Sequence, residues 1–182
     1  MFALTPRLTL RPGWPEDAAE LARAIGHEAV VRNLARAPWP YGTTDAEAVL
    51  AKAQAPHEPR FLIFDRTGPA SRLVGGMTID LTERDGPDLV YWIAPQAWGF
   101  GYATEAGRAV VAIARHALRL GRLQAGHFMD NPASARVLHK LGFRSTGRVV
   151  LRHSRGRGHA APCELFELDL DDVRVGPLPL AA

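Results

Sequence analysis

Two glycines near the middle of the chain stand where they could hold a phosphate. Gly99 and Gly101 lie in the segment 96–101, after a strand-like stretch (88–94) and before a long stretch with helical spacing of apolar residues. A helix N-terminus presents unpaired backbone N–H groups and a partial positive charge, and glycine lets an anion approach them because it lacks a Cβ. The loop predicts a phosphate-bearing ligand, although the same glycines would also suit a plain turn.

Two common nucleotide-binding loops do not fit this segment. A P-loop ends in Gly-Lys-Ser/Thr, whereas Gly101 is followed by Tyr102 and Ala103. A dinucleotide fingerprint requires Gly or Ala three residues after Gly101, where this chain has Thr104, and it belongs to a first βαβ unit rather than to mid-chain. Any phosphate held here therefore belongs to another class of ligand.

A second pair of polar residues follows the next strand-like stretch. Asn131 stands where a helix begins, and Ser134 lies one turn further, so both side chains can point at the end of the neighbouring strand. Each alone is also compatible with ordinary capping. Because ligands in α/β sheets sit beyond the carboxyl ends of central strands, we expect the glycine loop and Asn131 to lie at one edge of the sheet.

The elements that must position these groups follow from periodicity and turn residues. We expect strands at 8–11, 60–64, 73–81, 88–94, 123–129, 146–151 and 162–168. We expect helices at 15–26, at 28–35, from Thr43 or Thr44 to before Pro56, at 102–120, and from Asn131 to Gly142. This order predicts an α/β sheet with antiparallel hairpins and parallel crossovers in its middle.

Length and composition favour one domain that is not embedded in a membrane. The chain has 182 residues, of which 47% are hydrophobic, and we expect a single domain over 1–182 with a core of about 8–168 and a frayed tail at 175–182. No stretch approaches the run of about 20 apolar residues that a bilayer span requires, and the N-terminus lacks a secretory h-region. We therefore expect a cytoplasmic protein without a membrane partner.

Cysteine and charge exclude further classes. Cys163 is the single cysteine, which excludes an internal disulfide framework and a Cys-rich zinc site and fits a reducing compartment. The net charge is +3, and the arginines form only local clusters at 115/119/122 and 152/155/157, without interleaved aromatics. We expect no direct nucleic-acid binding, and we interpret both clusters as solvated faces.

The two motifs together resemble the GNAT superfamily of acyl-CoA-dependent N-acyltransferases. The resemblance rests on Gln96-x-x-Gly99-x-Gly101 and Asn131-Pro132-Ala133-Ser134, in this order of elements. The segments 92–95, 98–106 and 141–143 are most similar to the RimJ/RimL-like branch, the ribosomal-protein alanine N-acetyltransferases. The resemblance covers about 8–168 and implies a mixed, mostly antiparallel sheet of about seven strands, with a splayed parallel central pair and helices on both faces.

The resemblance implies acetyl-CoA as co-substrate and no metal. Backbone N–H groups of 98–104 would hold the pyrophosphate, and the pantetheine arm would pair like an added strand with backbone at 92–94. A backbone N–H near Ile93 could polarise the thioester carbonyl. The predicted cofactor-binding residues are Trp92, Ile93, Ala94, Gln96, Trp98, Gly99, Phe100, Gly101, Tyr102, Ala103, Thr104, Asn131 and Ser134.

The chemistry requires that the ammonium of the acceptor lose a proton and that the leaving thiolate gain one. Many GNAT members supply a tyrosine seven residues after the asparagine as the acid, and here that position is Leu138. In the ribosomal branch a serine matching Ser134 is implicated instead, and we expect Ser134 to be the proton donor.

The general base is left open among several groups. His127 and Glu164 rank first, His127 because imidazole titrates near neutral pH, although strand alternation could equally bury it. Behind them come Asp88, Tyr91, His153 and a water relay. Cys163 lies in a strand-like segment, and we interpret it as a semi-buried thiol rather than a nucleophile, which favours direct attack.

The acceptor side of the resemblance corresponds to 33–42 and 152–159. Trp39 and Tyr41 could wall a pocket or pin a loop, and the basic final hairpin would suit an acidic acceptor, a phosphate-bearing acceptor or a ribosomal surface. We expect acetyl transfer to a primary amine in a ternary complex, with a protein N-terminus such as that of a ribosomal protein as acceptor. A small amine (antibiotic, polyamine or amino acid) as acceptor and a non-catalytic acyl-CoA-binding module both stay open, as do a monomer and a homodimer.

Overall fold

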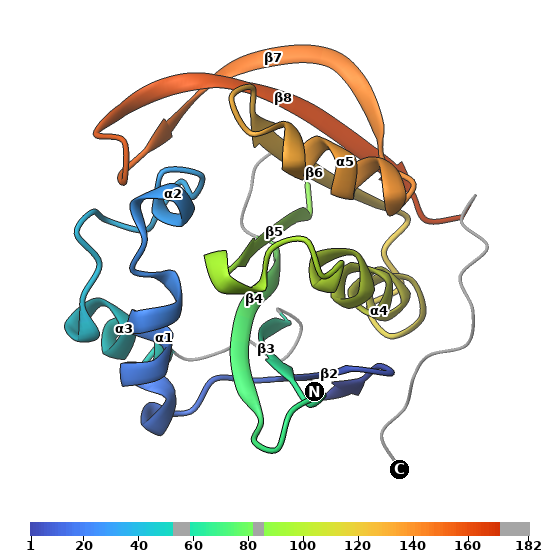
Figure 1. Ribbon diagram of the computed structural model, residues 1–182. Coiled ribbons are helices and arrows are strands. Elements are labelled where there is room, and N and C mark those ends of the chain that lie inside the picture. Colours follow the sequence, from blue (N-terminus) through green and yellow to red (C-terminus); the bar gives the residue numbers. More distant parts are fainter. Residues whose placement is uncertain (53–58, 82–85, 172–182) are drawn as a thin grey trace.

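The computed structural model describes residues 1–52, 59–81 and 86–171, so the predicted tail at 175–182 lies outside them. The described residues form one sheet of eight strands in the order β1-β2-β3-β4-β5-β6-β8-β7 (Figure 1). The strands are β1 Ala3–Leu4, β2 Leu8–Arg11, β3 Arg60–Asp65, β4 Arg72–Asp80, β5 Asp88–Ile93, β6 Arg122–Phe128, β7 Arg144–Ser154 and β8 His159–Asp169. The helices are η1 Pro15–Asp17, α1 Ala18–Ile25, α2 Glu28–Val31, α3 Thr43–Leu50, η2 Pro95–Ala97, α4 Tyr102–His116 and α5 Pro132–Lys140.

The only parallel neighbours in the described sheet are β5 and β6, and they touch at one point. Their ladder contains a single pair, Asp88 with Gln124, and the Gln124 N–H donates to the Pro87 carbonyl at 2.8 Å. Every other pair of adjacent strands is antiparallel. The predicted mixed sheet with a splayed parallel pair is therefore confirmed, with eight strands where about seven were expected.

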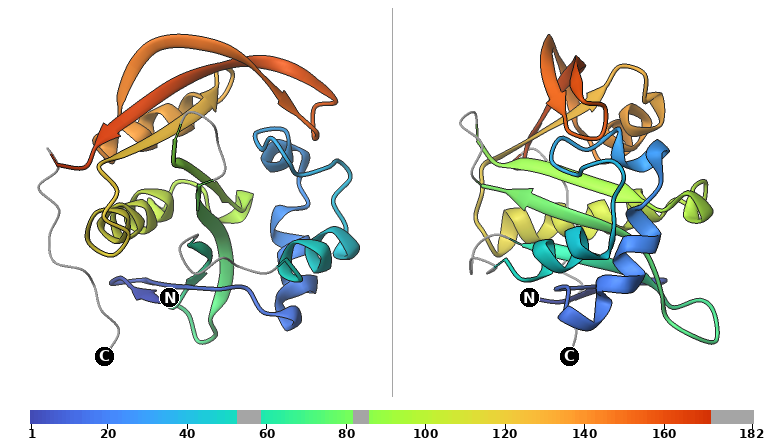
Figure 2. Two further views of the ribbon diagram at one scale, coloured as in Figure 1. Left: turned by 180° about the vertical axis from the view of Figure 1, so that it is seen from behind. Right: turned by 90° about the vertical axis from the view of Figure 1, so that its left-hand side faces the viewer.

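Helices cover both faces of the sheet, as predicted. Front and back views show α1–α3 on one side of β4 and β5, and α4 and α5 on the other (Figures 1 and 2). The larger apolar core lies under α4 and α5, and a separate core joins α1 and α3 to the opposite face. The middle of the sheet is thus covered by helices on both faces.

Several predicted boundaries are corrected by tertiary contacts. The additional strand is β1, whose two residues are too few to show a period in the sequence. Helix α2 ends at Val31 rather than Ala35, and α4 ends at His116 rather than Leu120, where Arg119 adopts a left-handed φ of 53°. Helix α3 starts after Gly42, not after a threonine cap, because Asp45 accepts the Gly42 N–H.

The last two strands form a long ribbon that arches over the sheet and reaches α2 (Figure 1). At its turn, Ser154 Oγ donates to the carbonyls of Arg32 and Leu34 at 3.2 and 2.8 Å. A Cβ on Gly156 would lie 2.7 Å from the Val31 carbonyl oxygen, so the close approach requires glycine. The ribbon and the segment after α2 are thereby joined above the sheet.

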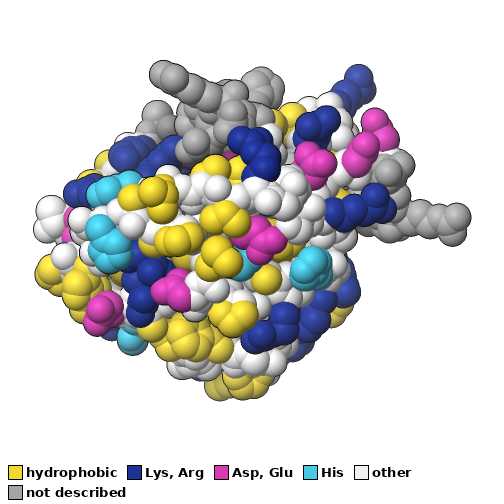
Figure 3. Space-filling model, turned by 90° about the horizontal axis from the view of Figure 1, so that it is seen from above, with side chains coloured by type: hydrophobic (Ala, Val, Ile, Leu, Met, Phe, Trp, Pro, Cys, Tyr) yellow, Lys and Arg dark blue, Asp and Glu magenta, His cyan; other side chains and the backbone are white. Residues whose placement is uncertain are grey.

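Seen from above, basic side chains are interspersed with apolar, acidic and histidine side chains and do not gather into one patch (Figure 3). Among the described residues, no helix is long and apolar enough to cross a bilayer.

Candidate active site

The glycine loop has the geometry that the sequence predicts for an anion site. Gly99 and Gly101 adopt left-handed φ values of 83° and 79°, and Gly101 is the N-cap of α4 without a side-chain cap. The N–H groups of Thr104 and Glu105 donate to the Gly101 carbonyl, whereas those of 99–103 reach no acceptor within the described chain. Consecutive donors are therefore left open at the positive end of a 15-residue helix.

Aromatic side chains alternate with these glycines. Trp98 and Phe100 are 50% and 57% exposed, and Phe100 stacks on Tyr102 with ring centroids 5.7 Å apart. The Trp98 indole N–H donates to the Ile93 carbonyl at 2.7 Å, which ties the loop back to the end of β5. Gln96 is exposed and lies in η2, between the end of β5 and the glycine loop.

An ion pair that sequence reasoning missed adjoins the loop. Glu105, in the first turn of α4, accepts from Thr5 Oγ1 at 2.6 Å and from the backbone N–H and Nε of Arg7 at 2.9 and 2.7 Å. Burial opposes ionisation of Glu105, but the hydrogen bonds from Thr5 and Arg7 outweigh it and lower its pKa. Arg7 thus neutralises a carboxylate that would otherwise repel an anion at this helix end. The partners are 98 residues apart, so no local signal links them.

Strand β5 presents backbone to the gap beside β6. The Ala94 N–H donates to the Val74 carbonyl in β4, and strand alternation directs the backbone of Trp92 to β4 as well. The gap-facing groups of β5 are therefore those of Tyr91 and Ile93. This corrects the predicted pairing surface at 92–94, since Trp92 and Ala94 use their backbone within the sheet and pack into the core under α1 and α3.

Asn131 and Ser134 lie at the start of α5, as predicted. Asn131 Oδ1 accepts the Ser134 N–H at 3.4 Å, and Ser134 Oγ lies 2.7 Å from the Tyr91 phenol oxygen. Burial raises the pKa of Tyr91 to about 12, so the phenol stays protonated near neutral pH and is a poor general base. Leu138 is fully buried and apolar, and it supplies no acid.

His127 and Glu164 face each other across β6 and β8. His127 Nε2 lies 3.3 Å from Glu164 Oε2, and its Nδ1 lies 2.8 Å from the Phe128 carbonyl. The hydrogen bond from Ser145 Oγ, at 2.5 Å, is the main cause that lowers the pKa of Glu164. Both ring nitrogens thus lie within hydrogen-bond distance of oxygen atoms of the protein itself, so the imidazole is held within the sheet.

The remaining base candidates lie apart from Ser134. Asp88 is buried on the face opposite Tyr91, where Arg152 contacts it at 3.2 Å. Its neighbour across the ladder is the buried Asp80, which Arg36 contacts at 2.6 Å. His153 is exposed on β7.

The basic hairpin is largely occupied by internal contacts. The Arg157 side chain is only 7% exposed, and its Nη atoms contact both carboxylate oxygens of Asp130 at 2.8 Å. It also donates to the Arg32 carbonyl at 2.6 Å and lies over the Phe128 ring. The interpretation of this cluster as a solvated face is wrong for Arg157. The hydrogen bonds that Arg157 donates to Asp130 are the largest cause of the lowered pKa of Asp130, the residue that precedes Asn131.

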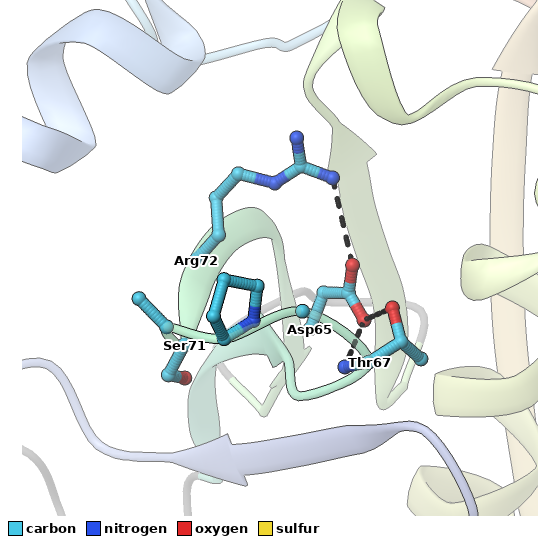
Figure 4. Close-up of a pocket in the computed structure, with 7 residues that line it drawn as sticks. Asp65, Thr67, Ser71 and Arg72 are labelled. Atoms are coloured by element: carbon cyan, nitrogen blue, oxygen red, sulfur yellow. Dashed lines mark hydrogen bonds and ion pairs between the residues drawn. The ribbon is translucent and has the colours of Figure 1, made fainter.

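Two further features stand apart from this chemistry. Cys163 is buried, and burial raises the pKa of its thiol, which agrees with the interpretation as an unreactive thiol. A hollow of about 470 Å³ lies in the β3–β4 turn, lined by the residues 65 and 67–72 (Figure 4). Asp65 and Thr67 are hydrogen-bonded to each other there, and none of the predicted site residues lines it.

Comparison with known proteins connects these observations. Residues 7–144 match the family described as acetyltransferase (GNAT) domain. A 65-residue stretch is 43% identical to the uncharacterized N-acetyltransferase YoaA of Bacillus subtilis (strain 168), and it spans 36% of this chain and 36% of that relative. The match thus covers little more than a third of the relative's length.

Two solved structures share the fold. A ribosomal-protein-S5-alanine acetyltransferase from Vibrio fischeri superposes with a TM-score of 0.77 at 17% identity, covering 97% of this chain and all of that one. RimJ of Mycobacterium smegmatis, in complex with CoA-disulfide, gives a TM-score of 0.76 at 23% identity over 92% of this chain and 84% of that one. At these identities the likeness establishes the fold alone.

Proposed function

Because this chain belongs to the GNAT acetyltransferase family, we propose that it transfers an acetyl group from acetyl-CoA to a primary amine by direct attack in a ternary complex. The observation that carries the proposal is the single rung between β5 and β6. It leaves strand backbone open directly beside the unpaired N–H groups at the start of α4. A phosphate-bearing ligand with an extended amide arm fits both halves of this site.

The donor would be held in two parts. Its pyrophosphate would accept from the N–H groups of 99–103, and its pantetheine arm would pair with the gap-facing backbone of Tyr91, since the Ile93 carbonyl already accepts from the Trp98 indole. The Ile93 N–H would then face the thioester carbonyl and stabilise the oxyanion of the tetrahedral intermediate.

Two proton movements complete the reaction. Ser134 would donate a hydrogen bond to the leaving sulfur from the first turn of α5, in place of the tyrosine that Leu138 replaces. His127 and Glu164 hold each other in the hydrogen-bonded pair described above, so the proton of the ammonium would leave through ordered water.

For the acceptor we propose a protein N-terminus such as that of a ribosomal protein. Support comes from the likeness to the Vibrio fischeri enzyme, which is named for alanine of ribosomal protein S5. The internal bonds of Arg157 argue against a dedicated phosphate site in the hairpin. The acceptor would then be recognised through its free amine and backbone.

A thiol-release assay tests the proposal. The purified chain is incubated with acetyl-CoA and a panel of ribosomal-protein N-terminal peptides, aminoglycosides, polyamines and amino acids. We expect turnover with the peptides. Turnover with a small amine alone would show that the acceptor is a small amine and not a protein N-terminus. Tight CoA binding without thiol release for any acceptor would indicate an acyl-CoA-binding module.

The variant Ser134→Ala tests the proton donor. We expect kcat to fall about 100-fold with little change in the affinity for CoA, because the serine acts on the leaving group. Unchanged turnover would remove Ser134 from the mechanism.

A further inference from the structure

A hydrogen bond joins β5 to α5 across the open side of the cleft. The Tyr91 phenol oxygen lies 2.7 Å from Ser134 Oγ and 3.2 Å from the Ser134 carbonyl oxygen. Tyr91 packs against the core under α4 and α5, so its ring has a fixed position. Two residues that are 43 positions apart thereby place a phenol on the serine that we propose as the donor to the leaving group.

The two hydroxyl groups share two protons, and only one arrangement frees Ser134. If the phenol donates to the Ser134 carbonyl, the Ser134 hydroxyl donates to the phenol oxygen, and its proton is then not available to the leaving group. If the phenol donates to Ser134 Oγ, the serine proton is available for another acceptor. The phenol oxygen lies nearer to Ser134 Oγ, at 2.7 Å, than to the Ser134 carbonyl oxygen, at 3.2 Å, which favours the second arrangement. Burial raises the pKa of Tyr91 to about 12, so the phenol keeps the proton that it donates.

The position of Tyr91 along β5 favours this role. Ile93 lies two residues further on the same strand, at a separation of about 6.6 Å along it, so Tyr91 is the neighbour on the same sheet face of the residue whose N–H would face the thioester. On α5, the residue one turn after Ser134 is the buried, apolar Leu138, which offers no hydroxyl. The phenol therefore reaches this place from the strand rather than from the helix.

We propose that Tyr91 is a positioning residue that turns the Ser134 hydroxyl toward the sulfur of acetyl-CoA, an inference that rests on the proposed function. As the amine nitrogen bonds to the acetyl carbon, the carbon–sulfur bond breaks and its electron pair passes to sulfur. Tyr91 donates into Ser134 Oγ, and Ser134 donates to the forming thiolate. Water receives the proton that the nitrogen loses and supplies one to the released thiolate.

A double-mutant cycle tests this coupling. We expect Tyr91→Phe to lower kcat about tenfold, the effect of one lost hydrogen bond, with KM for acetyl-CoA changed by less than about twofold. In the Ser134→Ala background the same substitution should have no further effect. Independent, multiplying losses, or a raised KM with unchanged kcat, would overturn the proposal.

The leaving group supplies a second readout. Acetyl-seleno-CoA releases a more acidic selenol, which leaves without help from a hydrogen-bond donor. We therefore expect the kcat deficit of Tyr91→Phe to shrink to within about threefold with this donor. An equal deficit with acetyl-CoA and acetyl-seleno-CoA would assign Tyr91 a purely structural role.

Thr67→Val is the matched control, because it also removes a hydroxyl hydrogen bond, to Asp65, but in the β3–β4 turn. Its kcat should match that of the wild type with both donors.

If Tyr91→Phe does not fold, 3,5-difluorotyrosine at position 91 keeps the hydroxyl and acidifies it, and the alkaline limb of kcat should move to lower pH. An unmoved limb would contradict the proposal, whereas a wild-type chain without turnover would refute the proposed function itself.

Discussion

The glycine loop and the β7–β8 hairpin both flank the proposed cleft, and they use their polar groups in opposite ways. The N–H groups of 99–103 find no acceptor among the described residues, while Arg157 directs its donors to Asp130, Asn33 and the Arg32 carbonyl. In sequence both segments look equally suited to an anion. Open donors indicate a ligand site, and occupied donors indicate a scaffold, so only the loop retains that interpretation.

The largest expected effect comes from a substitution in the glycine loop, whose N–H donors are open. Gly101→Val should weaken acetyl-CoA binding by at least about 100-fold, because a β-branched residue at φ 79° costs about 1–3 kcal/mol and its side chain would enter the site. Titration calorimetry with acetyl-CoA measures the change.

Gly121→Val is the control for the loop substitution, since Gly121 has no positive φ and a Cβ there would meet nothing within 4 Å. Its affinity for acetyl-CoA should equal that of the wild type. Normal binding by Gly101→Val would place the pyrophosphate elsewhere.

A second variant tests the β7–β8 hairpin, where the donors of Arg157 are occupied. Arg157→Met should lower the free energy of unfolding by about 2 kcal/mol, because it removes the donor to Asn33 Oδ1 and leaves Asp130 with Arg32 and the Arg32 carbonyl with Ser154 as their remaining donors. Urea denaturation measures this, and acetyl-CoA affinity should change little. Arg155→Met removes an exposed arginine with one contact at 3.5 Å and should behave as the wild type. A stable Arg157→Met variant with altered acceptor specificity would make the hairpin a binding surface instead.

The smallest effect concerns the ion pair beside the loop. The pKa of Glu105 is lowered on folding from its usual value of 4.5, so its ionised form stabilises the protein above that pH, and this stability is lost as pH falls through the lower folded value. Glu105→Gln should cost about 1 kcal/mol at pH 7 and progressively less below pH 4.5. Unfolding free energies between pH 3 and 7 give the profile, with the exposed Glu47→Gln as control. A pH-independent difference would mean that the carboxylate charge contributes nothing.

Local patterns predict most of the fold but few of the contacts between elements that are distant in sequence. Gly142, for example, ends α5 at a left-handed φ of 93°, as its place after an apolar repeat predicts. The order of strands and helices follows equally from periodicity and turn residues. Strand β1 escaped detection because two residues carry no period.

The candidate site divides in the same way. The open loop and the Asn131 cap are local, so the sequence reveals them directly. The contacts of Tyr91 with Ser134 and of Arg157 with Arg32 join residues 43 and 125 positions apart, which only the fold brings together. For His127, alternation could not distinguish a cleft position from a buried one, and its partner Glu164 settles that it is held by the sheet.

The single ladder pair between β5 and β6 leaves a gap in the sheet, and the acetyl-CoA of the proposed reaction would occupy that gap in place of a strand. Such a donor would contribute to the stability of the fold as well as to the reaction. At a concentration 100 times its Kd, any ligand that binds only the folded chain adds about 2.7 kcal/mol to its stability. The abundance of this protein in a cell would then follow the supply of its own co-substrate, with unloaded copies the first to be lost to proteolysis.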